Sequence, residues 1–160
     1  MNAAPLLRRI AATLADCRLE AVLIGNAAAA LHGAPVTTLD FDFLFRTSPT
    51  NIRKLKAFAD RLHATILRPY YPASSLFRVV DEDGGLQVDF MTTIHGVRTF
   101  ASLRARAQRL KLDGAELLVA SLDDVIRSKR AAGRPRDRAV LPILEATRAE
   151  ARAPRPPRKS

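Results

Sequence analysis

Cysteine, tryptophan and long apolar runs are what this 160-residue sequence has least of. It contains one cysteine, Cys17, and no tryptophan. A single cysteine excludes a disulfide within the chain and fits a reducing compartment. No run approaches the roughly 18 apolar residues that a membrane-spanning helix needs, and the N-terminal region lacks the apolar core of a signal peptide. We therefore expect a soluble cytoplasmic protein with no membrane partner.

Several familiar catalytic patterns are also missing. The three histidines, His32, His63 and His95, do not have the spacing of metal ligands, and no zinc pattern is present. There is no phosphate-binding Walker loop and no Ser/His/Asp arrangement. Aromatic residues make up only 6% of the chain, so stacking platforms for single-stranded nucleic acid are scarce.

Positive charge is abundant and unevenly distributed. The formal net charge is +10; residues 1–97 hold 10 Lys and Arg against 9 Asp and Glu, whereas residues 98–160 hold 16 against 7. A basic C-terminal half indicates a polyanionic partner such as tRNA or another RNA. The alternative is that these arginines mainly form a solvated surface.

The length and the hydrophobic content of 48% predict one domain with a substantial core. We expect this domain to occupy residues 1–150. Residues 151–160 are basic and rich in proline, and we expect them to form a disordered tail.

Periodicity predicts a mixture of helices and strands. Helices are expected at 5–17, directly after Gly25, at 48–63, at 122–132 and at about 136–150. Pro142 is expected to kink or split the last of them. Strands are expected at 21–24, 39–45, 75–80, 85–91, 109–112 and 115–119, with Pro69–Pro72 interrupting regular structure. This order favours an α+β fold, with a mixed, mostly antiparallel sheet and helices packed on it.

Three aspartates are the first candidate site residues. In the segment from Leu39 to Phe43, Asp40 and Asp42 alternate with phenylalanines, so both carboxylates share one face of a strand, roughly 6.6 Å apart along it. Asp89 occupies the same kind of position in the strand 85–91. If the two strands pair with their faces matched, three carboxylates converge, and such a cluster makes sense only if cations neutralise it. Magnesium suits oxygen ligands, and two ions can assist an in-line phosphoryl displacement.

Two further groups complete the candidate site. Gly25 ends the first strand, and Asn26 can cap the following helix, whose N–H groups attract phosphate. Lys129 lies on the apolar stripe of the helix 122–132, so it either extends outward to solvent or meets a negative group. Asp137 follows shortly after and is placed to pair with Lys129 or an arginine.

These residues resemble the nucleotidyltransferase superfamily with the polymerase-beta-like fold, and most of all the small AbiEii-type abortive-infection toxins. The family has a small-residue pair at a helix start, Arg-x-Thr, Asp-x-Asp, a later Asp, and a Lys followed by Gly-Arg-Pro-Lys-Asp. The corresponding residues here are Gly25-Asn26, Gly33, Val36-x-Thr38, Asp40-Phe-Asp42, Asp89, Lys129 and 133–137. The resemblance covers about residues 20 to 145.

The resemblance implies an enzyme that moves a nucleoside monophosphate from an NTP to a hydroxyl on tRNA, protein or a small molecule. It implies Mg²⁺, in a two-ion site that also accepts Mn²⁺, bound by Asp40, Asp42 and Asp89, with Asp89 as third ligand or base. Nucleotide binding is implied for a second set of residues: Gly25, Asn26, Thr38, Lys129 and Asp137. A role as the toxin of a toxin–antitoxin pair, with a cognate antitoxin as partner, also follows from the resemblance.

A second hypothesis stays open beside this one. Asn26 stands where the family has a second small residue, and Val36 stands where it has an arginine. These differences motivate a catalytically weakened or inactive module that keeps the fold and binds RNA or a partner protein. Saturable binding of Mg-NTP that depends on Lys129 separates the two hypotheses.

Overall fold

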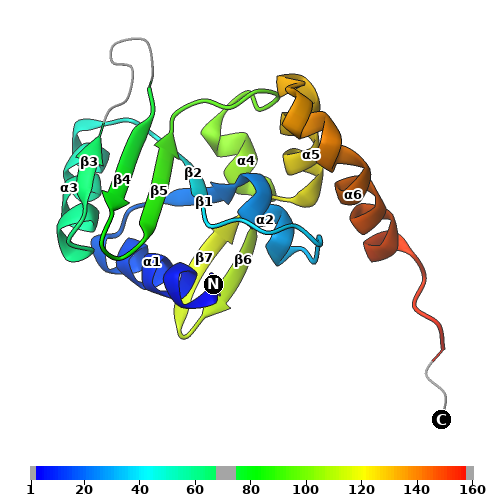
Figure 1. The fold of residues 1–160 in the computed structure, drawn as a ribbon, viewed down its shortest axis with the longest axis horizontal. Helices are drawn as coiled ribbons and strands as arrows, with labels where there is room; N and C mark the ends of the chain where they lie inside the picture. Colours follow the sequence, from blue (N-terminus) through cyan, green and yellow to red (C-terminus); the bar gives the residue numbers. More distant parts are fainter. Residues whose placement is uncertain (1–2, 68–74, 158–160) are drawn as a thin grey trace.

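A mixed sheet of seven strands, in the order β3-β4-β5-β2-β1-β7-β6, runs through the described part of the protein (Figure 1). The computed structural model describes residues 3–67 and 75–157. The strands are β1 (Ala21–Ile24), β2 (Phe41–Phe45), β3 (Thr65–Leu67), β4 (Phe77–Asp81), β5 (Leu86–Met91), β6 (Gln108–Leu112) and β7 (Ala115–Val119). β1 pairs with β7, and β2 with β5, in parallel; the other neighbouring pairs are antiparallel. The predicted α+β class and mostly antiparallel sheet are confirmed.

Six helices accompany the sheet in the described residues: α1 (Ala4–Cys17), α2 (Gly25–Leu31), α3 (Pro49–Arg61), α4 (Phe100–Arg106), α5 (Leu122–Ala132) and α6 (Pro135–Arg152). Hydroxyl side chains fix where three of them begin. Ser48, Thr99 and Ser121 each accept a hydrogen bond from the backbone N–H three residues later. These bonds satisfy N–H groups that the first turn of a helix leaves free.

The aromatic part of the core lies on the face of the sheet that α1 and α3 cover. Phe43 of β2 stacks on Phe90 of β5 with ring centroids 5.5 Å apart, and Phe58 of α3 meets Phe90 edge-on at 5.3 Å. Because successive strand residues point to opposite faces, burying Phe41, Phe43 and Phe45 directs Asp42 to the other face. The hydrophobic alternation of β2 therefore positions an acidic side chain away from the core.

Several elements differ from the sequence-based expectation. Asp40 precedes β2 instead of lying in it, and the short elements β3 and α4 were not expected. α6 is a single helix with Pro142 inside it, so Pro142 does not split it, and the alternative of a kink stays a prediction. Leu141 and Leu144 on either side of the proline pack on the core, and this burial offsets the lost helical hydrogen bond.

Two remaining expectations concern the ends and the loops. α6 ends at Arg152, two residues beyond the expected Glu150, and residues 153–157 are exposed. The predicted interruption at Pro69–Pro72 lies outside the described residues. None of the described helices combines the length and the apolarity that crossing a lipid bilayer demands.

Candidate active site

Asp42 and Asp89 are brought together by the parallel pairing of β2 with β5. They are direct register partners, so both side chains lie on the sheet face opposite the phenylalanine core. Asp40 stands just before β2 and is exposed, whereas Asp89 is only 7% exposed. The predicted matching of the two strand faces is therefore present. Among residues 3–67 and 75–157, however, no group of three or more His, Cys, Asp and Glu side chains is arranged to hold a metal ion.

Asp42 is a carboxylate whose surroundings disfavour its charged form. The pKa of Asp42 is raised to about 6, first by burial and then by the negative charges of Asp89 and Asp40; Lys129 and Arg136 partly oppose the shift. A carboxylate that is desolvated beside other carboxylates favours its protonated form until a cation approaches. The site thus has an excess of negative charge at Asp42.

Gly25 brings the chain close to this carboxylate. Its φ of +68° suits glycine, and a Cβ at this position would stand 3.3 Å from Asp42 Oδ2. α2 begins at Gly25 itself with Ile24 at the N-cap and no side-chain capping bond, so the prediction that Asn26 caps this helix was wrong. Asn26 instead lines a cavity, and its buried Oδ1 has no hydrogen-bond partner in the described part of the chain.

Thr38 holds the backbone in front of the acidic strand. Its hydroxyl donates to the carbonyl oxygen of Asp40 and accepts from the N–H of Asp40, both at 3.0 Å. Such local hydrogen bonds fix a turn. Thr38 therefore positions the Asp40 backbone.

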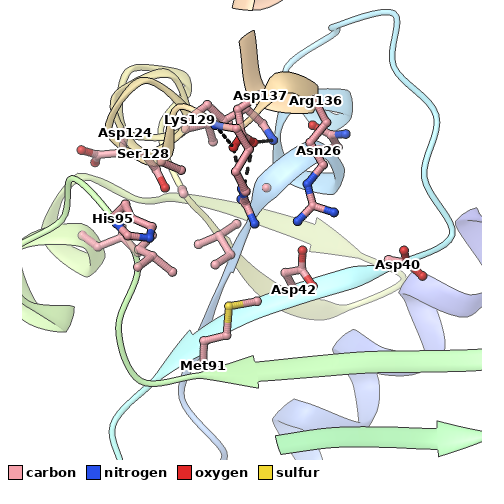
Figure 2. Close-up of a pocket in the computed structure, with 18 of the residues that line it drawn as sticks. Asn26, Asp40, Asp42, Met91, His95, Asp124, Ser128, Lys129, Arg136 and Asp137 are labelled. Carbon is pink, nitrogen blue, oxygen red and sulfur yellow. Dashed lines mark hydrogen bonds and ion pairs between the residues drawn. The ribbon is translucent and has the colours of Figure 1, made fainter. Parts of the chain in front are cut away.

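Lys129 faces the acidic strand from α5, across the cavity shown in Figure 2. Its side chain is 14% exposed, and its Nζ lies 3.6 Å from Asp137 Oδ1. Burial lowers the pKa of Lys129, and the Asp137 carboxylate limits that decrease. The Lys129–Asp137 pairing that the sequence suggested is observed.

Asp137 is placed by the tight turn between α5 and α6. Gly133 ends α5 with φ +62°, which turns the chain so that α6 begins at once. Asp137 accepts hydrogen bonds from Arg134, through Nε at 2.6 Å and the backbone N–H at 3.2 Å. Burial acts to raise the pKa of Asp137, but the bonds and charge of Arg134 together with Lys129 outweigh it and lower the pKa. Asp137 is therefore an ionised support for Lys129.

The cavity between β2 and α5 has a volume of about 430 Å³, and different residues line its two ends. Asp42 and Arg136 lie toward one end, and His95 and Ser128 toward the other (Figure 2). The loop that carries His95 packs tightly on α5, because a Cβ at Gly96 would stand only 2.9 Å from the Arg127 carbonyl oxygen.

A second hollow of about 470 Å³ lies beside the first. Asp40 and Asp42 line both hollows, whereas Asp89, Arg78 and Gln87 line only the second. The two acidic residues of the β2 segment therefore stand at the boundary between two spaces.

Arg78 is a member of this site that the sequence-based reasoning missed. It lies opposite Asp89 in the antiparallel β4–β5 hairpin and donates two hydrogen bonds to it, Nε to Oδ1 at 2.9 Å and an Nη to Oδ2 at 3.0 Å. The signal was the hairpin itself, because the register of its two strands decides which side chains stand opposite each other.

Comparison with known proteins places this geometry in a recognised fold. Neither a family model nor a curated protein sequence matches the chain. Among solved structures it is similar to the antibiotic-resistance factor ANT(2″)-Ia in complex with adenylyl-2″-tobramycin, at a TM-score of 0.60 and 16% identity over 93% of this chain and 96% of that one.

Two further structures agree. TM1012 from Thermotoga maritima, described as a nucleotidyltransferase, is similar at a TM-score of 0.55 and 18% identity, over 92% of this chain and 88% of that one. An antigenic nucleotidyltransferase-like protein from Paracoccidioides brasiliensis gives 0.54 and 15%, over 91% and 74%. The closer resemblance to AbiEii-type toxins stays a prediction. The chain has the fold of the nucleotidyltransferases.

Proposed function

We propose that this protein is a metal-dependent nucleotidyltransferase, which moves a nucleoside monophosphate from an NTP to a hydroxyl acceptor. The observation that carries the proposal is the cavity with Asp42 on its sheet wall and Lys129 on its helix wall, in a chain with the nucleotidyltransferase fold. A half-buried lysine and a half-buried carboxylate on facing walls suit a triphosphate that arrives with a divalent cation.

The donor set of the β2 segment fits such a cation. Asp40 and Asp42 supply the hard oxygen ligands that Mg²⁺ or Mn²⁺ prefers, and the raised pKa of Asp42 marks an excess of negative charge that a cation relieves. When bound, the ion neutralises phosphate charge and makes the α-phosphorus easier to attack.

The remaining steps belong to the side chains of this chain. Lys129 binds phosphate oxygens, and Asp137 holds its ammonium group in place. Arg136 adds positive charge at the end of the cavity near Asp42. The other end, near His95 and Ser128, receives the base of the nucleotide. In the second hollow the acceptor oxygen bonds to the α-phosphorus while its proton passes to Asp89; the α–β phosphoanhydride bond breaks and pyrophosphate leaves.

The acceptor classes in this proposal are tRNA or another RNA, a protein and a small molecule. A toxin role with a cognate antitoxin, and a cytoplasmic location, belong to the same proposal. The competing reading is a non-catalytic binding module, and two observations favour it: Val36 packs on the core where the family has an arginine, and Asn26 Oδ1 is buried without a donor.

Nucleotide binding provides the first test. A non-hydrolysable NTP analogue is titrated with Mg²⁺ into the wild type and Lys129→Met, followed by calorimetry. We expect saturable binding that Lys129→Met weakens at least about tenfold, because a charge-assisted hydrogen bond contributes roughly 1.5–3 kcal/mol. The matched control is Lys56→Met, at an exposed position of α3 on the opposite face of the sheet.

Label transfer provides the second test. The wild type and Asp42→Asn are incubated with α-labelled NTPs, Mg²⁺ and total RNA or protein. Transfer by the wild type and none by Asp42→Asn supports the enzyme. RNA binding with neither Mg-NTP binding nor label transfer favours the binding module.

A further inference from the structure

The Arg78–Asp89 pair changes what the third carboxylate of the site can do. The guanidinium group donates one hydrogen bond to each of the two carboxylate oxygens, at 2.9 and 3.0 Å. This fork-to-fork arrangement is the strongest that Arg and Asp form. Asp89 is only 7% exposed, and its carboxylate lies between the guanidinium group and the second hollow.

The pair is built into the sheet. Arg78 and Asp89 are register partners in the middle of the β4–β5 hairpin, with Val79 paired to Val88 on one side and Phe77 to Phe90 on the other. Val79, Val88 and Phe90 are completely buried, which fixes the register of both strands. The backbone therefore holds the two side chains opposite each other.

Arg78 also acts on the other two carboxylates. Arg78 lines the second hollow together with Asp40, Asp42 and Asp89, so its positive charge faces all three. It therefore supplies, next to all three acidic residues, a permanent positive charge of the kind that a second divalent ion supplies in a two-ion site.

We propose that Arg78 takes the place of the second ion, so that this protein holds one divalent ion per site, bound by Asp40 and Asp42, with Asp89 outside the coordination sphere. Arg78 is then a positioning residue that keeps Asp89 directed at the acceptor hollow. This inference rests on the proposed nucleotidyltransferase function, and it departs from the two-ion site that the sequence predicts.

The experiment counts Mn²⁺ ions by electron paramagnetic resonance, in the presence of a non-hydrolysable NTP analogue. We expect one bound Mn²⁺ per wild-type chain. Arg78→Gln frees the Asp89 carboxylate and is expected to gain a second Mn²⁺, which a purely structural arginine would not cause. Arg53→Gln, at an exposed position of α3, is the control and keeps one ion.

A charge-matched pair of variants decides whether Asp89 is a ligand. Arg78→Gln combined with Asp89→Asn removes one charge of each sign, and we expect its Mn²⁺ affinity to stay within about fivefold of the wild type. Asp42→Asn removes a proposed ligand and is expected to lose at least about tenfold.

Each result has a definite reading. Three results would overturn the inference while leaving the proposed function intact. They are two Mn²⁺ ions in the wild type, a single ion in folded Arg78→Gln, and a tenfold loss of Mn²⁺ affinity in the double variant. Absence of any nucleotide-dependent Mn²⁺ in the wild type overturns the proposed function, and this inference with it. The wild-type count decides the matter even if Arg78→Gln does not fold.

Discussion

Asp42 illustrates how one residue can be unfavourable for stability and necessary for the proposed chemistry. Its pKa rises from an ordinary 3.8 to about 6 in the folded protein, first through burial and then through Asp89 and Asp40. The folded state therefore binds the proton more tightly than the unfolded state does. Below about pH 4 both states are protonated and Asp42 has no effect; as the pH rises to 6 the protein loses stability, and above 6 the full cost is present.

Replacing this carboxylate is expected to stabilise the ion-free protein. In EDTA at pH 8, Asp42→Asn should unfold at a higher urea concentration than the wild type, by about 1–2 kcal/mol after allowance for partial exposure. The difference should shrink to about 0.5 kcal/mol or less at pH 4. Asp60→Asn, at an exposed site on α3, is the control and should change little at either pH. Equal or lower stability of Asp42→Asn at pH 8 would contradict this account.

Asp137 is expected to set the pH range in which Lys129 is charged. Burial already lowers the pKa of Lys129, and Asp137 limits the decrease. Asp137→Asn removes that support, so Lys129 loses its proton at a lower pH than in the wild type. We expect nucleotide-analogue binding to weaken at least about tenfold at pH 8 and to recover partly at pH 6.5. Calorimetry at both values measures this, and an unchanged dissociation constant at pH 8 would speak against it.

Single-residue patterns revealed part of this site. Alternation in the two acidic strands indicated that Asp42 and Asp89 face away from the core, and the apolar stripe of α5 singled out Lys129. Arg78 remained hidden, because its partner depends on hairpin register, which is a property of two strands together. The predicted capping role of Asn26 failed because α2 begins at Gly25, which places Asn26 inside the first turn of the helix instead of at its N-cap.

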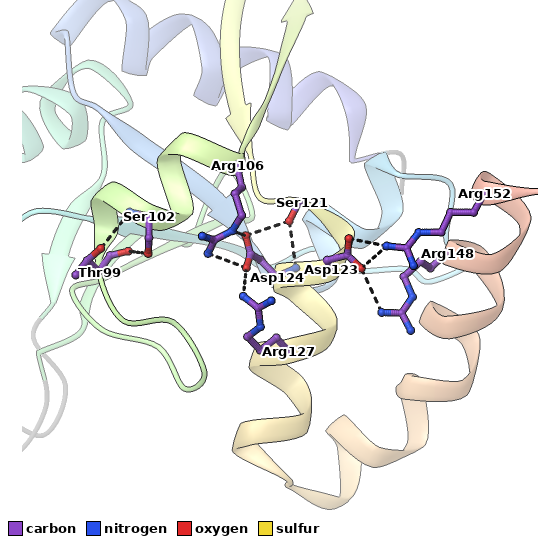
Figure 3. A network of polar contacts seen from close by, with 9 residues as sticks. All are labelled: Thr99, Ser102, Arg106, Ser121, Asp123, Asp124, Arg127, Arg148 and Arg152. Carbon is purple, nitrogen blue, oxygen red and sulfur yellow. Dashed lines mark hydrogen bonds and ion pairs between the residues drawn. The ribbon is translucent and has the colours of Figure 1, made fainter.

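At the scale of elements, ion pairs fasten α5 to its neighbours (Figure 3). Asp124, 1% exposed, accepts two hydrogen bonds from Arg106 of α4 and one from Arg127 of its own helix, each between 2.8 and 2.9 Å. Asp123, on the exposed side of the same helix, binds Arg148 and Arg152 of α6. Adjacent aspartates therefore connect α5 to two different helices. Asp124 does so through buried ion pairs, and Asp123 does so through ion pairs that are exposed to solvent.

The two aspartates form a matched test of burial. Asp124→Asn leaves two guanidinium groups without their buried partner, and we expect a loss of about 2–4 kcal/mol in the free energy of unfolding. Asp123→Asn breaks exposed pairs and should cost less than about 1 kcal/mol. Urea denaturation of both variants, with the slope unchanged, measures the difference. Similar losses in the two variants would show that burial does not determine the contribution.

Element prediction succeeded where periodicity was long and failed where tertiary contacts decide. The long helices α1, α3 and α5 and the hairpin strands follow their hydrophobic patterns. β3 has three residues and α4 has seven, too few for a pattern to stand out. Pro142 predicted a kink or a split in α6; the helix is not split, because burial of Leu144 within the core keeps it continuous.

For the whole molecule, a net charge of +10 overstates the positive surface available to a partner. In the described residues, arginines 104, 106, 109, 127, 130, 134, 148 and 152 all form ion pairs with carboxylates. The charge asymmetry was readable from the sequence, whereas this internal pairing depends on the packing of α4, α5 and α6. Residues 153–157, in contrast, are exposed, and the segment 153–160 adds three basic residues by sequence.

The C-terminal segment is therefore expected to contribute more to polyanion binding than the paired arginines do. Binding of a single-stranded RNA is followed by fluorescence anisotropy between 50 and 200 mM KCl. Ending the chain at Arg152 removes three basic residues, so the slope of log affinity against log salt should become shallower by about 2, at roughly 0.7 per phosphate contact. The charge-neutral double variant Asp123→Asn with Arg148→Gln breaks a pair without changing net charge and should keep the wild-type slope. An unchanged slope in the shortened chain would show that residues of the folded domain, and not the C-terminal segment, make the phosphate contacts.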